Sequence, residues 1–303
     1  MSSRWIDIER VVEKPFLEAT ASYHEAGPVL LGLPLDSTVS FRPGTRFGPA
    51  RIRAVSEGLE TYSPVLDRDL ADLPLHDAGS LVLPWAQVEE ALQRIEAAVG
   101  ALVDDGHWPF LLGGEHLVTL GVLRALARRY PDLVVIQFDA HADQRDVYMG
   151  EPLSHATVMR RAGELLGTGR IYQVGIRSGD REEMTWARTH GRLLPAEPAA
   201  ALAALREVRQ ELGNRPVYVT MDLDVVDPGL APGVGTPEPG GWTGSELLAG
   251  VYALQGLNVV GCDLVELSPP NDGPGEAAAF LAAKVVREAL RELDLEDLPS
   301  IGL

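Results

Sequence analysis

The sequence predicts an α/β fold with a mostly parallel β-sheet and helices on both faces, and three observations support this prediction. Short apolar runs alternate with amphipathic stretches along most of the 303 residues, which is typical of βαβ units. No Pro/Gly/Ser-rich linker, low-complexity tract or internal repeat divides the chain. Metal-ligand side chains directly follow several apolar runs, where parallel sheets place their sites. We therefore expect one domain over residues 1–303, with an irregular N-terminal segment over residues 1–27.

The apolar runs predict the strands because each is short and bounded by turn residues. In chain order these strands are Pro28–Leu33, Phe110–Leu112, Leu133–Phe138, Ile171–Ile176, Pro216–Met221 and Asn258–Leu267. The stretches between them carry apolar residues at helical spacing. They predict helices over Trp85–Val103, Leu117–Arg129, Ala156–Leu166, Arg181–His190, Ala199–Leu212, Gly244–Leu254 and Glu276–Leu293.

Three segments rich in turn residues interrupt this alternation: Ser40–Pro49, Gln144–Ser154 and Pro228–Gly241. The density of proline and glycine in the last segment excludes a helix or a central strand and indicates a shaped loop. Loops on the ligand side of a rigid sheet usually carry specificity. We therefore expect such loops to contribute to specificity.

The composition is that of a globular protein with a sizeable core, because 46% of the residues are hydrophobic and 23% are charged. No apolar run approaches the roughly 20 residues that a membrane helix needs, and we expect no membrane partner. The N-terminus is too charged for a secretory signal, so we expect a cytoplasmic protein. The single cysteine, Cys262, excludes an internal disulfide and is expected to be a small core residue.

The charge balance is strongly acidic, since 26 basic minus 44 acidic residues leaves a net charge of −18. This excess argues against nucleic acid as a partner and fits a cationic substrate that is attracted by the field of the protein. Solubility alone also accounts for such an excess, so the net charge does not by itself identify a ligand.

Metal-ligand residues follow three of the predicted strands. Asp139, His141 and Asp143 come after Leu133–Phe138 and alternate along the chain, so their side chains point the same way. Asp222 and Asp224 follow the strand Pro216–Met221, and His116 follows Phe110–Leu112 within the segment Gly113-Gly-Glu-His116. A single Asp-x-Asp usually caps a loop. Three such clusters at three strand ends predict a metal centre.

Six nitrogen and oxygen donors without a thiolate favour two hard divalent ions over a structural zinc site, which uses four ligands and typically includes cysteine. We expect two Mn²⁺ ions, with Fe²⁺, Co²⁺ and Zn²⁺ as alternatives. Two ions held together lower the pKa of a shared water and supply a nucleophile near neutral pH.

Two further residues point to hydrolysis at this centre. His155, in the segment Ser154-His-Ala-Thr157, is placed to shuttle a proton to a leaving amine. Glu266 lies near the end of the predicted strand Asn258–Leu267, where its carboxylate can bind a guanidinium bidentately. Asp263, in the middle of that strand, is expected to be hydrogen-bonded into the scaffold.

Together these motifs resemble the ureohydrolase family, which comprises arginases, agmatinases and their relatives, over residues 28–292. Two further segments resemble the bacterial agmatinase branch. The motifs are Gly113–His116, Asp139–Asp143, Met221–Pro228 and the following Ala231–Gly241, and the two branch segments are Arg42–Pro49 and Gly150–Ala156. The family's glycine pair often continues Asp-His-Ser, whereas this chain has Glu115 and Leu117, neither of which is a ligand position.

The resemblance implies an arginase-like three-layer α/β/α fold around a mainly parallel eight-stranded sheet, usually assembled as a trimer or hexamer. It also implies hydrolysis of agmatine to putrescine and urea at two Mn²⁺ ions. One ion would be held by His116, Asp139, Asp143 and Asp222, and the other by His141, Asp139, Asp222 and Asp224. Asp143 would also hydrogen-bond the nucleophile, Glu266 would orient the guanidinium and His155 would handle the proton.

The substrate's tail is the open question. The loop residues 144–150 are expected to meet it, and Tyr148 and Thr236 are expected among the substrate-binding residues together with His155 and Glu266. The loop lacks the Ser/Asn-rich sequence of an arginase-type carboxylate site, which favours agmatine, although Arg145 could pair with a carboxylate. Guanidinobutyrate, guanidinopropionate, arginine and formiminoglutamate are the alternative substrates. A related mononuclear zinc deacetylase and a metal-dependent binding protein without turnover are the alternative classes.

Overall fold

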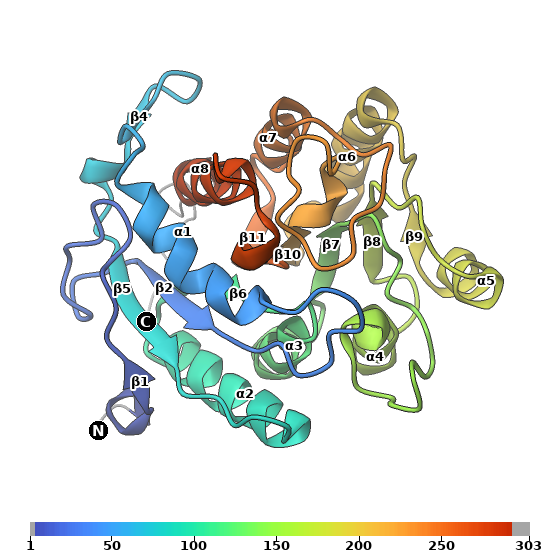
Figure 1. Cartoon of the computed structure of the whole chain (residues 1–303), viewed down its shortest axis with the longest axis horizontal. Helices are drawn as coiled ribbons and strands as arrows, with labels where there is room; N and C mark the ends of the chain where they lie inside the picture. The colour runs from blue at the N-terminus through green and yellow to red at the C-terminus, as the bar shows by residue number, and fades with distance from the viewer. Residues whose placement is uncertain (1–3, 293–303) are drawn as a thin grey trace.

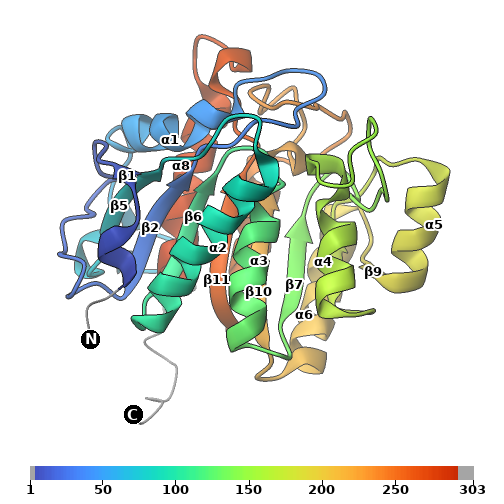
Figure 2. The ribbon, with the colours of Figure 1, turned by 90° about the horizontal axis from the view of Figure 1, so that it is seen from below.

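The computed structural model describes residues 4–292 and contains a central nine-stranded sheet. Figures 1 and 2 show that this sheet lies between two layers of helices. The strand order is β1-β5-β2-β6-β11-β10-β7-β8-β9. All neighbouring strands are parallel except β1, which pairs with β5 in the antiparallel direction. The strands are β1 (Arg10–Val11), β2 (Pro28–Leu33), β5 (His76–Leu81), β6 (Trp108–Gly113), β7 (Val134–Phe138), β8 (Ile171–Val174), β9 (Arg192–Leu193), β10 (Pro216–Asp222) and β11 (Asn258–Val265).

The helices form one layer on each face of the sheet (Figure 1). One layer consists of α2 (Val88–Asp104), α3 (Val118–Arg129) and α4 (Val158–Leu166), and the other of α1 (Gly48–Ser56), α6 (Pro198–Leu212), α7 (Gly244–Tyr252) and α8 (Ala277–Glu292). Helix α5 (Arg181–His190) lies beside β9 at one end of the sheet. A separate small hairpin joins β3 (Tyr62–Ser63) to β4 (Arg68–Asp69). None of the helices within residues 4–292 is long and apolar enough to cross a membrane.

Each central strand contributes to two hydrophobic cores because its side chains alternate between the faces of the sheet. On β2, Leu30 packs into the core under α1, α6, α7 and α8, whereas Leu31 packs into the core under α2, α3 and α4. Both side chains are fully buried. Burial on both faces explains why these strands appear in the sequence as continuous apolar runs.

The predicted three-layer α/β/α architecture is confirmed, but the sheet has nine strands where the resemblance implied eight. Eight of them are mutually parallel, and the ninth is the two-residue β1, within the segment expected to be irregular. The sequence also missed β5, whose residues His76–Leu81 include Asp77 and Gly79 and do not form an apolar run. Helix α1 begins at Gly48, at the end of the turn-rich Ser40–Pro49.

All six predicted strands and all seven predicted helices are present, with ends displaced by a few residues as is usual for such boundaries. One difference matters for function. The last predicted strand stops at Val265, so Glu266 lies just beyond β11. The predicted helix Glu276–Leu293 corresponds to α8, and Leu293 lies outside the described residues.

Four neighbouring strands in the middle of the sheet, β6, β11, β10 and β7, carry the predicted site residues at their carboxyl ends. Because parallel strands end at the same edge, side chains that are far apart in the sequence meet there. The three turn-rich segments lie at this edge, and each of them contributes at least one residue to the cleft described below.

Candidate metal centre

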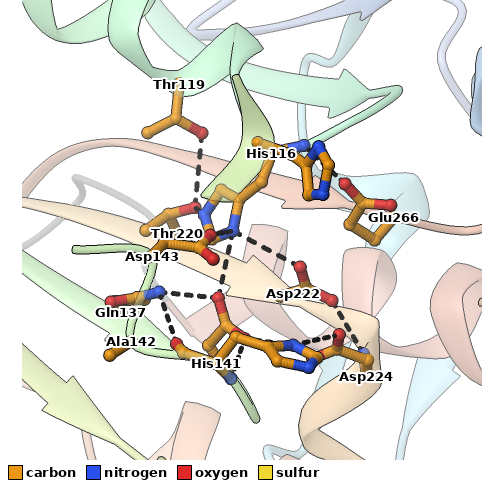
Figure 3. Close-up of polar contacts among 12 residues, drawn as sticks. His116, Thr119, Gln137, His141, Ala142, Asp143, Thr220, Asp222, Asp224 and Glu266 are labelled. Carbon is orange, nitrogen blue, oxygen red and sulfur yellow. Dashed lines mark hydrogen bonds and ion pairs between the residues drawn. The ribbon is translucent and has the colours of Figure 1, made fainter. Parts of the chain in front are cut away.

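The six predicted ligands all lie at this edge of the sheet, and Figure 3 labels His116, His141, Asp143, Asp222 and Asp224 among them. His116 follows β6, the run Asp139–Asp143 follows β7, Asp222 ends β10, and Asp224 lies in the 3-10 turn Leu223–Val225. All are buried except His141, which is partly exposed.

His116 faces three carboxylates at once. Its Nδ1 atom lies 3.1 Å from Asp139 Oδ2, 3.1 Å from Asp143 Oδ2 and 3.3 Å from Asp222 Oδ2. None of the three contacts has the geometry of a hydrogen bond, and among residues 4–292 this nitrogen has no hydrogen-bond partner. The other ring nitrogen, Nε2, pairs with the hydroxyl of Thr220 at 2.9 Å.

His141 forms a second group with Asp139 and Asp224. Its Nδ1 lies 2.9 Å from Asp224 Oδ2 and 3.6 Å from Asp139 Oδ1. Two sets of converging donor atoms, His116–Asp139–Asp222 and Asp139–His141–Asp224, are each compact enough to hold an ion. Asp139 is common to both sets and offers a different oxygen to each histidine. The geometry therefore provides two adjacent cation positions with a shared carboxylate.

The donor set fits divalent cations. With Nε2 of His116 paired to Thr220, a lone pair on Nδ1 would face three carboxylate oxygens, an arrangement that is repulsive unless a cation lies between them. A proton on Nδ1 could satisfy only one of these oxygens. Carboxylate and imidazole donors suit hard or borderline divalent ions, and the single cysteine, Cys262, is buried in the core away from them.

The pKa values of the carboxyl groups report the same crowding. Burial, together with the negative charge of Asp139, raises the pKa of Asp143 to about 7. Burial and the charges of Asp224 and Asp139 raise the pKa of Asp222 well above its ordinary value. Burial also raises the pKa of Glu266 well above its usual range. These carboxyl groups are thus held together at a cost that bound cations would offset.

The backbone is adapted locally to bring these side chains together. Asp143 and Glu266 both have positive φ values, 52° and 68°, which are uncommon for residues with a side chain. The carbonyl of Asp143 accepts the amides of Met159 and Arg160, and the amide of Glu266 donates to the carbonyl of Gly114 at 2.8 Å. Such conformations persist where the surroundings fix them, and they cluster at functional sites.

Gly114 explains part of the Gly-Gly-Glu-His motif. A Cβ atom at this position would lie 2.0 Å from the carbonyl oxygen of Leu35, because the chain after β6 crosses directly over the chain after β2. The amides of Gly114 and Glu115 donate to the carbonyls of Leu33 and Leu35 at this crossing. The close crossing places His116 at the centre of the site.

Polar side chains on the strands and on α3 form hydrogen bonds with the candidate ligands and with the scaffold around them. Gln137 Nε2 donates to Asp139 Oδ2 at 2.6 Å and to the carbonyl of His141 at 3.3 Å. Asp263 accepts from the hydroxyls of Thr119 (2.7 Å) and Tyr218 (2.6 Å), in line with its expected place in the scaffold.

The candidate metal centre borders a cleft of about 350 Å³. The predicted residues His116, His141, Asp143, His155, Asp222, Tyr148, Thr236 and Glu266 all line it. Asp139 and Asp224 lie behind this surface, and Thr236 donates to Asp224 Oδ2 at 3.5 Å. One oxygen of Glu266 accepts the amide of His116 at 2.7 Å, which fixes the carboxylate at the cleft wall.

The outer wall of the cleft contains residues that the sequence did not indicate, namely Ser40, Ser178, Gly179, Asp180 and Glu183. Arg145 also lines the cleft, but its charge is already paired. Its guanidinium contacts Asp180 Oδ2 at 3.2 Å and Glu183 Oε2 at 3.3 Å, and it lies over the ring of Tyr148. Asp180 and Glu183 begin helix α5 as a reciprocal capping box. The spacing of Asp180 and Glu183, typical of a capping box, is the sequence pattern that could have drawn attention to these two residues.

His155 opens the 3-10 turn His155–Thr157 and lies against the ring of Tyr148, with 5.6 Å between ring centroids. Burial lowers the pKa of His155 to about 4. The imidazole is therefore neutral at physiological pH, and it must take up a proton before it can deliver one.

A model of the arginase family matches residues 26–291 of the chain. The agmatinase of Bacillus subtilis (strain 168) is 49% identical over 279 residues, which cover 91% of this chain and 95% of the relative. The guanidinobutyrase of Pseudomonas aeruginosa is 36% identical, over 95% of this chain and 92% of the relative. Among solved structures, the agmatine ureohydrolase of Thermoplasma volcanium superposes with a TM-score of 0.85 at 34% identity, over 93% of this chain and 95% of that one. The match of the family model, the extent of these alignments and the geometry of the centre agree, and the chain belongs to the arginase family.

Proposed function

We propose that this protein is an agmatinase, which hydrolyses the guanidino group of agmatine to putrescine and urea. The observation that carries the proposal is a cleft with different chemistry at its two ends. One part of the cleft carries the candidate ligands of a binuclear metal centre, and the outer wall carries two carboxylates with a single guanidinium. Relatives that carry the name agmatinase support the same substrate.

The metal ligands are the six residues predicted from the sequence. One ion would be held by His116, Asp139, Asp143 and Asp222, and the other by His141, Asp139, Asp222 and Asp224. Mn²⁺ is the metal that we propose, because the donors are carboxylate oxygens and imidazole nitrogens without a thiolate. When bound, two such ions would supply a water of lowered pKa as the nucleophile.

Three side chains of the cleft would perform the remaining steps. Glu266, anchored by the amide of His116, orients the guanidinium of the substrate through charge-assisted hydrogen bonds. Asp143 accepts a hydrogen bond from the attacking water and directs it toward the guanidinium carbon. His155 takes up a proton released from the attacking water and transfers it to the departing primary amine. Its neutral form is the one suited to begin this cycle.

The outer wall selects the substrate's tail. Arg145 would attract a carboxylate if it were free, but Asp180 and Glu183 already neutralise it and leave a negative excess. The side chain of Asp180 is 47% exposed, so it remains accessible to an ammonium group. The wall therefore favours the amine of agmatine over the carboxylate of 4-guanidinobutyrate, and Tyr148 and Thr236 would contact the chain between the two ends.

The deciding experiment is urea release by Mn²⁺-loaded protein from agmatine, arginine, 4-guanidinobutyrate and 3-guanidinopropionate. Asp139→Asn, which removes the carboxylate common to both ion positions, is the matched control and should be inactive. Turnover confined to agmatine would support the proposal. Preference for a carboxylate-bearing substrate would overturn the interpretation of Arg145. Absence of urea from all four substrates would contradict the proposal. Hydrolysis of formiminoglutamate and a binding role without turnover would then be the next hypotheses to test.

Three further expectations remain predictions of the same proposal. They are a single domain over residues 1–303, a trimeric or hexameric assembly, and a cytoplasmic location. Size-exclusion chromatography with light scattering would test the assembly directly.

A further inference from the structure

Five side chains form one continuous series of hydrogen bonds from the cleft into the core. The hydroxyl of Tyr148 donates to Ser40 Oγ at 3.3 Å, and Ser40 Oγ pairs with His155 Nε2 at 3.4 Å. On the other side of the ring, His155 Nδ1 pairs with Thr38 Oγ1 at 3.3 Å. Thr38 in turn donates to Glu115 Oε2 at 3.0 Å.

The hydrogen bonds of the buried residue Glu115 determine which atoms donate and which accept along this series. Glu115 is fully buried, and its Oε2 atom accepts both the amide (2.8 Å) and the hydroxyl (3.0 Å) of Thr38. A hydroxyl has one proton to donate, and Thr38 gives it to Glu115. Toward His155, Thr38 Oγ1 can therefore only accept.

Thr38 Oγ1 has two lone pairs, and His155 fills both. The backbone amide of His155 donates to this oxygen at 3.0 Å, and the remaining lone pair faces Nδ1 at 3.3 Å. Nδ1 must therefore carry the proton of the neutral ring, which leaves Nε2 as the acceptor.

The cleft side of the ring is consistent with this assignment. Ser40 accepts the proton of Tyr148 and so has its own proton available for Nε2. The distance of 3.4 Å is at the long end for such a bond, so a substrate N–H can replace Ser40 at Nε2. Ser40, Tyr148 and His155 all line the cleft.

We propose that Glu115 is a positioning residue that, through Thr38, fixes His155 as the Nδ1–H tautomer. Nε2 is then the atom that accepts a hydrogen bond, and subsequently a proton, in the cleft. This inference rests on the proposed function for its role in turnover, whereas the tautomer itself can be observed without substrate or metal.

The test is the ¹⁵N NMR spectrum of protein labelled at histidine, recorded metal-free and with diamagnetic Zn²⁺. The signal that is absent from His155→Gln identifies His155. Wild type should show the Nδ1–H tautomer. Glu115→Leu frees the Thr38 hydroxyl to donate to Nδ1, so it should shift His155 to the Nε2–H tautomer. Glu115→Gln keeps an oxygen that can accept both Thr38 bonds and should restore the wild-type tautomer.

A second pair of variants covers the case in which Glu115→Leu does not fold. Thr38→Val removes the acceptor for Nδ1 and should weaken the Nδ1–H preference, whereas Thr38→Ser should preserve it. With agmatine, Thr38→Val and Glu115→Leu should lower kcat about tenfold, the effect of one misplaced hydrogen bond, with KM and metal content nearly unchanged.

Two results would overturn the inference. One is an Nε2–H tautomer in the wild type, and the other is the same tautomer in wild type, Glu115→Leu and Thr38→Val. The proposed function fails in a different way. The Nδ1–H tautomer in a protein that releases no urea from agmatine would contradict the agmatinase assignment and leave the tautomer assignment intact.

Discussion

Thr220 on β10 and Gln137 on β7 lie opposite each other in register, and each contacts one residue of the proposed metal centre. Thr220 pairs with His116 Nε2, and Gln137 donates to Asp139 Oδ2. Both lie two residues before an aspartate of the centre, so the same face of the sheet carries the ligands and the groups behind them. Such outer partners orient metal ligands and tune their affinity.

Gln137→Leu should weaken Mn²⁺ binding by about 10–100-fold, because Asp139 loses the donor that fixes its orientation. Calorimetric titration of metal-free protein with Mn²⁺ measures this change. Gln93→Leu, which removes an exposed amide on α2, is the matched control and should bind Mn²⁺ like the wild type. Equal affinity in Gln137→Leu and Gln93→Leu would refute the supporting role of Gln137.

Asp222→Asn should have opposite effects on the metal-free and metal-loaded protein. When folding raises the pKa of a carboxyl group, the free energy of unfolding falls as the pH rises above about 4, which is the pKa of that group in the unfolded chain. Because burial and its neighbours raise the pKa of Asp222, metal-free Asp222→Asn should melt above metal-free wild type near pH 8. With Mn²⁺ the order should reverse, because the variant lacks a ligand.

Asp227→Asn provides the contrast, since hydrogen bonds from the amides of Gly229, Gly240 and Gly241 lower the pKa of Asp227. This variant should melt below wild type with or without metal. The melting temperatures of wild type, Asp222→Asn and Asp227→Asn, measured after chelation and again with Mn²⁺, test these expectations. A metal-free Asp222→Asn that melts no higher than wild type would contradict the crowding argument.

Acid should destabilise the folded protein through His155. Folding lowers the pKa of His155 to about 4, whereas an unfolded histidine titrates near about 6.5. The unfolded chain therefore takes up the proton first, and His155 costs stability as the pH falls from about 6.5 to about 4. Urea denaturation of metal-free protein should show that His155→Gln loses about 1–3 kcal/mol less than wild type across this window.

His24→Gln replaces an exposed imidazole and serves as the control for that experiment. If His155→Gln and wild type lose the same free energy of unfolding between about pH 7 and about pH 4.5, the histidine is not held in its neutral form by burial.

Asp180→Asn should lower kcat/KM for agmatine about tenfold, because the outer wall loses the exposed charge proposed to meet the amine. Asparagine is as good an N-cap as aspartate, so α5 should keep its start and the melting temperature should hardly change. The preference for agmatine over 4-guanidinobutyrate should fall in parallel. Glu182→Gln, which removes a neighbouring exposed charge that does not line the cleft, should keep the wild-type preference. Identical preferences in both variants would remove Asp180 from the specificity argument.

The sequence indicated the inner part of the site because each ligand follows an apolar strand, and the carboxyl ends of parallel strands must meet. That argument needs only strand ends and strand direction, so it placed His116, Asp139 and Asp222 together. It could not place Asp180 and Glu183, although the helix that they begin was predicted. Their position depends on how the chain turns after β8, where Ser178 bridges to His141, and no local pattern encodes that contact.

The same limit applies to Thr38 and Ser40. They lie in a loop with no helical or strand periodicity, and their partner His155 is more than a hundred residues away. Strands β1 and β9 escaped prediction because each has only two residues. Strand β5 escaped because Asp77 is buried as the partner of Arg53, and this ion pair cannot be read from an apolar pattern.

The two outermost strands have a consequence for how the protein behaves at high concentration. β1 and β9 contain two residues each, and each includes an arginine. A long, flat and apolar outer strand would offer free backbone groups to another chain and promote aggregation, whereas short strands with a charged residue discourage such pairing. The broad parallel sheet therefore ends on both sides in a form that resists growth into intermolecular sheets, and the net charge of −18 adds repulsion between molecules.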